Sequence, residues 1–175
     1  PVPANAFYDW PGIIKILEDA ELWWAPGTEQ GYHALTKGFL CGEILRRVTG
    51  QTIGEFLQQE FAGPLGLDFF MGVPDDRIDD VATMIFPEQA EPPADFFLSV
   101  EANPDGIQSK VFTNDGGHME EFQTEAALKS EIPAAGGLAT AKGLASIYAP
   151  FACGGELNGN RFVDQDHLMR MSSVS

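Results

Sequence analysis

Apolar residues recur at the spacing of an amphipathic helix in several stretches of this chain, separated by polar or turn-forming residues. The first stretch follows Asp9, which can cap a helix with Pro11 in its first turn, and it fades near Glu21. The second covers residues 33–49, with two arginines in its last turn and Gly50 directly after it. Both stretches predict helices with one apolar face. On the second helix, the apolar residues near helical spacing are Leu35, Phe39, Leu40, Ile44, Leu45 and Val48.

Three further helices have clear starting signals. Thr52 and Glu55 form a capping-box pattern ahead of an apolar run, which should stop at the Gly-Pro pair of residues 63–64. Thr140 can cap a helix whose apolar residues follow i, i+3, i+4 and i+7 spacing. Asp164 predicts the start of a last helix.

The segments between these helices carry weaker signals. Residues 67–73 form a short apolar run that is typical of a strand, and residues 94–102 predict a short helix within a stretch interrupted by prolines. The Ala-Ala-Gly-Gly-Leu sequence at 134–138 predicts a flexible loop, and Asn-Gly at 158–159 predicts a tight turn.

The acidic composition narrows the classes of partner. The chain carries 26 acidic and 10 basic residues, a formal net charge of -16. Such a surface repels phosphate backbones and anionic lipid, so neither nucleic acid nor a membrane is an expected partner. Residues 1–4 are not a signal peptide, and any export signal would precede Pro1. Without such a signal the expected compartment is the cytoplasm, and the sequence leaves the oligomeric state open.

The cysteines and histidines do not predict a metal site. Cys41 and Cys153 are the only cysteines, and neither clusters with histidine at the spacing of zinc ligands. We therefore expect no metal and no organic cofactor. Both cysteines lie in apolar helical runs, which favours buried thiols, and a disulfide between them stays open as an alternative.

Complete catalytic motifs are absent from the 175 residues. The sequence has no Gly-x-Ser-x-Gly elbow, no P-loop and no His-Glu-x-x-His, and no serine is followed three residues later by lysine. An ordered series of segments remains. It consists of Trp-Ala-Pro-Gly-Thr-Glu-Gln-Gly-Tyr-His-Ala at 24–34, Gly-Pro-Leu-Gly-Leu-Asp at 63–68, Gly-Gly-Leu-Ala-Thr at 136–140 and Gly-Gly-Glu-Leu-Asn-Gly at 154–159.

The order and spacing of these segments resemble the serine β-lactamase-like hydrolases. This family includes class C β-lactamases, esterases built on the same fold and D-alanyl-D-alanine peptidases. The resemblance lies in residues 24–67 and 132–162. It implies an α+β protein with the β-lactamase/DD-peptidase-like (transpeptidase-like) fold. Residues 1–175 would form a single partial domain, the mostly helical subdomain without most of the main sheet. We expect such a fragment to be inactive alone and to expose apolar surface.

The family builds its active site from three motifs, and only the middle motif is present. A Ser-x-x-Lys motif supplies the nucleophile and an activating lysine, a Tyr-x-Asn-like motif supplies a tyrosine, and a Lys-Thr-Gly or His-x-Gly strand completes the pocket. The middle motif stands here as Tyr32-His33-Ala34. The first motif would be expected before Pro1 and the third after Ser175, so the sequence resembles an internal segment of a longer protein.

The resemblance implies that Tyr32 is catalytic. An isolated phenol keeps its proton at neutral pH, but the positive end of the following helix and a lysine ammonium would favour the phenolate. Tyr32 could then take the serine proton during attack and return it to the leaving group. The alternative is a core aromatic residue that packs ahead of the helix.

The resemblance also implies three substrate-binding residues, namely His33, Gly136 and Gly137. His33 could line the pocket, or it could be a surface or helix-capping histidine. Gly136 replaces an aromatic residue of class C β-lactamases and would open the pocket wall for a bulkier acyl or alcohol group. The alternative for both glycines is a plain turn ahead of Thr140.

Ala34 bears on the substrate. Class C β-lactamases have asparagine at this position, and alanine has no side-chain amide to bind a substrate amide. We therefore expect an esterase-like serine hydrolase that acts on small esters or amides through an acyl-enzyme. A true β-lactamase or D-alanyl-D-alanine peptidase is a second hypothesis, and a non-catalytic homologue that binds a ligand or partner is a third.

Overall fold

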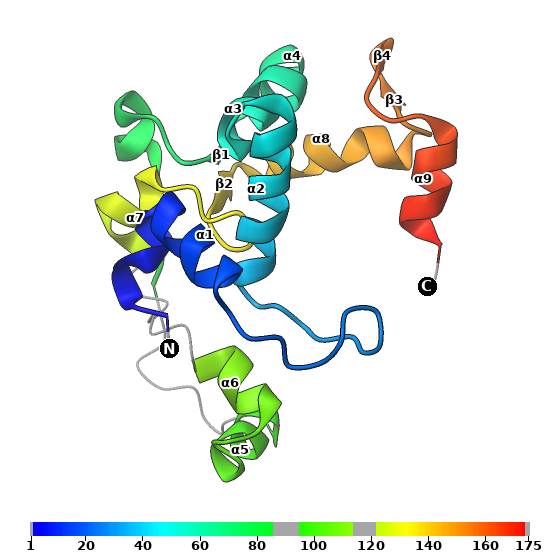
Figure 1. Cartoon of the computed structure of the whole chain (residues 1–175). Helices are drawn as coiled ribbons and strands as arrows, with labels where there is room; N and C mark the ends of the chain where they lie inside the picture. Colours follow the sequence, from blue (N-terminus) through cyan, green and yellow to red (C-terminus); the bar gives the residue numbers. More distant parts are fainter. Residues whose placement is uncertain (1, 86–94, 114–121, 174–175) are drawn as a thin grey trace.

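The computed structural model describes residues 2–85, 95–113 and 122–173. Its N-terminal part is a short 3-10 helix, η1 (Ala4–Tyr8), followed by α1 (Trp10–Glu18) and α2 (Thr36–Thr49). The Asp9 carboxylate accepts the Gly12 N–H at 3.2 Å, which confirms the predicted cap. Gly50, with φ of 78°, ends α2 in the left-handed conformation. Figure 1 shows α1 lying across α2 near the middle of the molecule.

The main core lies between η1, α1 and α2. The Phe39 ring contacts Phe7 at a centroid distance of 5.9 Å and Trp10 at 5.2 Å. The buried members of this core are Ala6, Phe7, Ile13, Ile14, Phe39 and Ile132. This core is small, because it is built mainly from the first 39 residues. Only one side of α2 packs in it.

The side of α2 that faces away from α1 is apolar and exposed. Of the six apolar residues near helical spacing, Leu40, Ile44 and Val48 are exposed, and only Phe39 is fully buried. We define the outer face of α2 as Lys37, Leu40, Cys41, Ile44 and Val48. The exposed apolar residues agree with the expectation that this chain exposes apolar surface. Periodicity along a helix predicts an apolar face but does not reveal whether a neighbour covers it.

Both cysteine predictions also need correction. Cys41 and Cys153 are exposed and free, so neither thiol is buried and the two do not form a disulfide. Cys41 belongs to the outer face of α2, which explains its exposure in an apolar run.

The helix after Thr52 continues beyond its predicted end. The capping box of Thr52 and Glu55 is present at the start of α3 (Ile53–Leu57). The helix then widens into a π-helical turn, η2 (Gln58–Ala62), and continues as α4 (Gly63–Leu65). The Gly63 N–H bonds to the Gln58 carbonyl five residues earlier, which leaves room for the Pro64 ring, and the helix ends only at Gly66.

Two short antiparallel sheets complete the centre and the C-terminal part. β1 (Phe69–Met71) lies within the predicted strand and pairs with β2 (Gly137–Ala139), with Phe70 opposite Leu138. Residues 137–138 are therefore in a strand and not in the flexible loop that their glycines predicted. β3 (Glu156–Leu157) and β4 (Asn160–Arg161) form a hairpin whose turn is the predicted Asn-Gly pair.

The remaining elements surround this centre. α5 (Asp95–Ala102) confirms the predicted short helix, and the Thr140 and Asp164 side chains cap α8 (Ala141–Ala152) and α9 (Gln165–Ser172). Three elements were not predicted from the sequence, namely η3 (Asp75–Asp80), α6 (Ile107–Thr113) and α7 (Glu125–Lys129). The β3–β4 end of the chain is tied back to η2, because Phe162 stacks on Phe61 at 5.2 Å.

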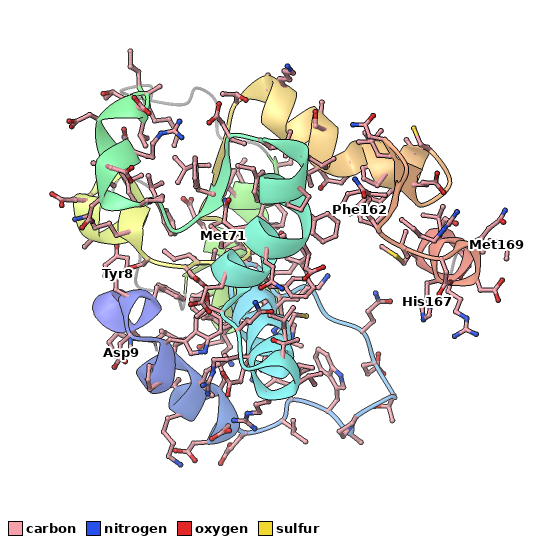
Figure 2. The ribbon with its side chains drawn as sticks, turned by 90° about the horizontal axis from the view of Figure 1, so that it is seen from above. Tyr8, Asp9, Met71, Phe162, His167 and Met169 are labelled. Atoms are coloured by element: carbon pink, nitrogen blue, oxygen red, sulfur yellow. The ribbon has the colours of Figure 1, made fainter. Side chains whose placement is uncertain are left out.

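The C-terminal helix stands away from the main core. Figure 2 shows α9, with His167 and Met169 labelled, at the far end of α8 from η1 and Tyr8. In the part of the chain that the structure describes, no helix combines the length and apolar character that a membrane crossing requires.

Candidate functional site

The loop between α1 and α2 returns the chain to the start of α2, where Tyr32 lies. A β-turn forms at 25–28, in which the Thr28 N–H donates to the Ala25 carbonyl at 3.1 Å and Gly27 has φ of 82°. The loop is tightened further by Trp24 against Gly31. A Cβ on Gly31 would lie 2.6 Å from the Trp24 ring, so only glycine fits under the indole. These contacts confirm the predicted Pro-Gly turn, and they hold the backbone of the loop that leads to Tyr32.

Tyr32 is a surface residue and not part of the core. Its side chain is 70% exposed, and its ring stacks on Phe112 of α6 at a centroid distance of 6.0 Å and an interplanar angle of 16°. The hydroxyl group is therefore not enclosed among aliphatic core residues. The alternative that Tyr32 is a core aromatic ahead of α2 does not fit this placement.

His33 and the open start of α2 lie directly beside Tyr32 in sequence. The His33 Nδ1 is 2.9 Å from the hydroxyl oxygen of Thr36, the first residue of α2. Leu35 is the N-cap and makes no side-chain capping bond, so no side chain of the cap residue covers the first N–H groups of α2. The positive end of the helix dipole therefore faces the segment that carries Tyr32 and His33.

A second segment, which leads to Gly136 and Gly137, packs against the first turn of α2. A Cβ on Gly38 would lie 2.5 Å from the backbone nitrogen of Ala134, so α2 and this segment are in direct backbone contact. The Gly136 N–H donates to the Ile132 carbonyl at 2.6 Å and closes a tight turn. The structure thus brings the Gly136 turn to the same end of α2 that follows Tyr32.

The two glycines have different surroundings within this segment. A Cβ on Gly136 would approach the Ile132 carbonyl to 3.1 Å, so the turn itself leaves little room for a side chain there. Gly137 is exposed and opens β2 opposite Met71, where a Cβ would make only ordinary contacts. The tight turn therefore restricts the side chain at Gly136, whereas the position of Gly137 has room for a Cβ.

Three phenylalanines, of which Phe112 contacts Tyr32, were not identified as site residues from the sequence. Phe112 of α6 contacts Phe96 of α5 at 4.9 Å, and Phe96 contacts Phe97 at 5.4 Å. The predicted helix at 94–102 gave the location of two of these rings. Nothing in the sequence linked them to Tyr32, which lies more than 60 residues earlier.

The arrangement offers an exposed phenol, an uncapped helix start and a neighbouring aromatic surface. Within residues 2–85, 95–113 and 122–173, no cluster of three His, Cys, Asp or Glu side chains could hold a metal ion. The chemistry that these groups can support is proton transfer by a phenol next to an apolar surface.

Comparison with known proteins gives the family. The Beta-lactamase family model matches residues 1–175. The chain is 35% identical over 145 residues to the esterase/beta-lactamase LipL of Mycobacterium tuberculosis (strain ATCC 25618 / H37Rv), covering 79% of this chain and 33% of that protein. The chain therefore spans about a third of the length of this relative.

Two solved structures share the fold. A penicillin-binding protein homolog from Caulobacter crescentus is 29% identical with a TM-score of 0.78, and the match covers 99% of this chain and 44% of the homolog. A family VIII carboxylesterase is 26% identical with a TM-score of 0.80, with 98% and 43% covered. The described part of the chain is mostly helical with few strands and has the expected penicillin-binding-protein/β-lactamase-like fold. The chain belongs to the beta-lactamase family of serine hydrolases.

Proposed function

We propose that this chain is the helical part of an esterase that works through an acyl-serine intermediate, with Tyr32 as its proton-transfer residue. The serine would come from a Ser-x-x-Lys motif in a longer polypeptide. Its hydroxyl oxygen attacks the ester carbonyl while the Tyr32 phenolate takes the hydroxyl proton. Tyr32 then gives this proton to the departing alcohol, and water releases the acid from the serine.

The observation that supports this role is the exposed phenol of Tyr32 at the uncapped start of α2. A proton-transfer residue must be reachable by substrate and nucleophile, and a buried tyrosine would not be. A lysine of the Ser-x-x-Lys motif would assist this proton transfer in the full-length hydrolase.

The proposed substrate class is small esters or amides, with esters preferred. Ala34 offers no side-chain amide to a β-lactam or peptide substrate. The similarity to a carboxylesterase and to a protein named esterase/beta-lactamase also supports this class. His33 and Gly137, which are exposed, and Gly136, which closes the neighbouring turn, are proposed to border the substrate.

The decisive variant is Tyr32→Phe in a full-length hydrolase that contains this chain. We expect kcat for a short-chain chromogenic ester to fall by about 10²–10⁴-fold, the usual contribution of positioned acid–base catalysis. Tyr148→Phe, at another exposed tyrosine, is the matched control and should retain full activity. Unchanged ester turnover by Tyr32→Phe would show that Tyr32 is not the proton-transfer residue.

Substrate preference is tested on the same protein with a chromogenic ester and a chromogenic cephalosporin. We expect kcat/KM to be higher for the ester. A higher value for the cephalosporin would assign the protein to the β-lactamases. A protein that binds both compounds and hydrolyses neither would be a non-catalytic homologue.

We also propose that the outer face of α2 packs against the rest of that hydrolase. Leu40, Ile44 and Val48 are exposed on one side of a helix whose other side is already in the core. More than half of each of the two solved structures lies outside the region matched by this chain, so a large part of the fold is available to cover them. A contiguous apolar surface of this kind is typical of a face that has a partner.

A further inference from the structure

An aromatic surface extends from Tyr32 across α6 and α5. We name it the aromatic shelf and define it as Phe96, Phe97 and Phe112. Tyr32 stacks in parallel on Phe112 at 6.0 Å, Phe112 meets Phe96 edge to face at 4.9 Å, and Phe96 meets Phe97 edge to face at 5.4 Å. The four rings form one continuous chain of contacts, at distances and angles typical of aromatic pairs.

The aromatic shelf is open to solvent although its rings are apolar. Phe97, at the end of the chain of rings, is 54% exposed, and Phe96 and Phe112 are each 39% exposed. Leu98 and Ile107 are exposed on the same two helices. Isolated exposed apolar residues are common, but a contiguous group of this kind marks a binding surface.

The two helices that carry the aromatic shelf are tied to each other on their buried side. The Ser109 hydroxyl of α6 donates to the Val100 carbonyl of α5, and both residues are buried. The Ser99 hydroxyl donates to the Phe96 carbonyl at 2.8 Å within α5. Figure 1 shows α5 and α6 side by side, apart from the helices of the core.

We propose that the aromatic shelf binds the long apolar chain of an ester whose carbonyl carbon reacts beside Tyr32. This inference rests on the proposed function and adds the substrate class, namely esters with an extended apolar group on the acyl or the alcohol side. Contact of that group with the phenylalanine rings removes apolar surface of both partners from water, which stabilises the bound ester.

The phenylalanines of the aromatic shelf lie at increasing distance from the Tyr32 ring along the chain of contacts. Phe112 contacts Tyr32 directly, whereas two rings, Phe112 and Phe96, lie between Tyr32 and Phe97. A short ester at Tyr32 would therefore not reach Phe97, and a long one would. The length of the apolar chain should decide whether Phe97 matters.

The test uses the full-length hydrolase with Phe97→Ala. Its substrates are p-nitrophenyl acetate and p-nitrophenyl octanoate for the acyl side, and ethyl acetate and octyl acetate for the alcohol side. We expect kcat/KM to fall about tenfold for the long ester of at least one pair, mainly through KM, and less than twofold for both short esters. The pair that shows the loss identifies the side that the shelf binds.

Two further variants serve as controls. Phe97→Leu keeps an apolar side chain at the position and should restore most of the activity on the long ester. Leu144→Ala removes a side chain of similar exposure, 48%, from α8 and should affect long and short esters equally little. Circular dichroism of Phe97→Ala establishes that α5 and the rest of the fold persist.

Equal kcat/KM losses on long and short esters would overturn the proposal, since they would mean that the shelf only supports Tyr32. Unchanged values for all four esters would overturn it as well. Failure of the proposed function has a different signature, because Tyr32→Phe would then leave the turnover of long and short esters unchanged.

Discussion

The Glu43 carboxylate lies between α1 and α2 and accepts hydrogen bonds from three side chains. Its side chain is only 7% exposed and accepts hydrogen bonds from the Trp10 indole at 2.9 Å, from Arg46 at 2.8 Å and from Arg47 at 2.7 Å. Arg47 also reaches Glu18 of α1 at 2.6 Å. Glu43 through Trp10, and Arg47 through Glu18, therefore hold α2 against α1, whereas Arg46 contacts Glu43 within α2.

The contacts of Glu43 predict an acid-sensitive contribution to stability. The Arg46 guanidinium and then the Trp10 indole lower the pKa of Glu43 from 4.5 to about 2. Because the folded state lowers this pKa, the stabilisation is complete above pH about 4.5 and is lost as the pH falls towards about 2. Urea unfolding of the wild-type protein, followed by tryptophan fluorescence, should show this decline.

The variant Glu43→Gln should lower the free energy of unfolding by about 1–3 kcal/mol at pH 7, because it weakens charge-assisted hydrogen bonds at a buried position. It should also remove most of the decline between pH 4.5 and 2. Glu18→Gln is the control, since its exposed pair should contribute less than about 1 kcal/mol. Equal effects of both substitutions would contradict the special role of Glu43.

At the level of elements, local signals predicted helix starts well. Asp9, Thr52, Thr140 and Asp164 each cap the helix that their sequence context predicted, because a cap depends on residues only a few positions away. The family resemblance implied site roles for Tyr32 and Gly136, and these roles stay predictions, although the structure places both residues near the start of α2.

Features that depend on distant parts of the chain could not be predicted in this way. Gly137 joins a strand only because Met71 pairs with it across 66 residues of sequence. Leu40 and Ile44 belong to an apolar pattern that predicts a helix but does not predict whether another element packs on that side of α2. The contact of Tyr32 with Phe112 likewise depends on how α6 folds back, and no local pattern encodes it.

The contact between α2 and the segment before β2 predicts the effect of Gly38→Ala. The added Cβ would lie 2.5 Å from the Ala134 nitrogen and would push the start of α2 away from the Gly136 turn. We expect a loss of about 1–3 kcal/mol in the free energy of unfolding, the usual cost of overpacking. Ester turnover of the full-length hydrolase should fall as well.

Lys37→Ala is the matched control for this substitution, since it changes the neighbouring exposed position of the same helical turn. It should stay within about 0.5 kcal/mol of the wild type. A Gly38→Ala protein as stable as Lys37→Ala would show that the backbone contact can relax without cost.

At the scale of the whole molecule, the outer face of α2 is an apolar surface that the described part of the chain leaves uncovered. Cys41 lies on this face and is exposed, which provides a chemical probe of the proposed packing. In the full-length hydrolase we expect Cys41 to react at least tenfold more slowly with iodoacetamide than in the same protein unfolded in urea. Peptide mass spectrometry distinguishes Cys41 from Cys153.

The matched variant for this measurement is Ile44→Asp, which places a charge in the middle of the outer face. It should restore the reactivity of Cys41 in the full-length protein by loosening the packing. A fully reactive Cys41 in the unmodified hydrolase would rule out that the outer face of α2 is covered, and it would leave the proposed role of Tyr32 unaffected.

The same apolar face sits on a molecule with a formal net charge of -16. Two copies of the isolated chain would be drawn together by this face and held apart by their like charges. Salt screens the repulsion over roughly 10 Å at 0.1 M and leaves the hydrophobic attraction in place. Ionic strength would thus govern whether separate copies remain dispersed.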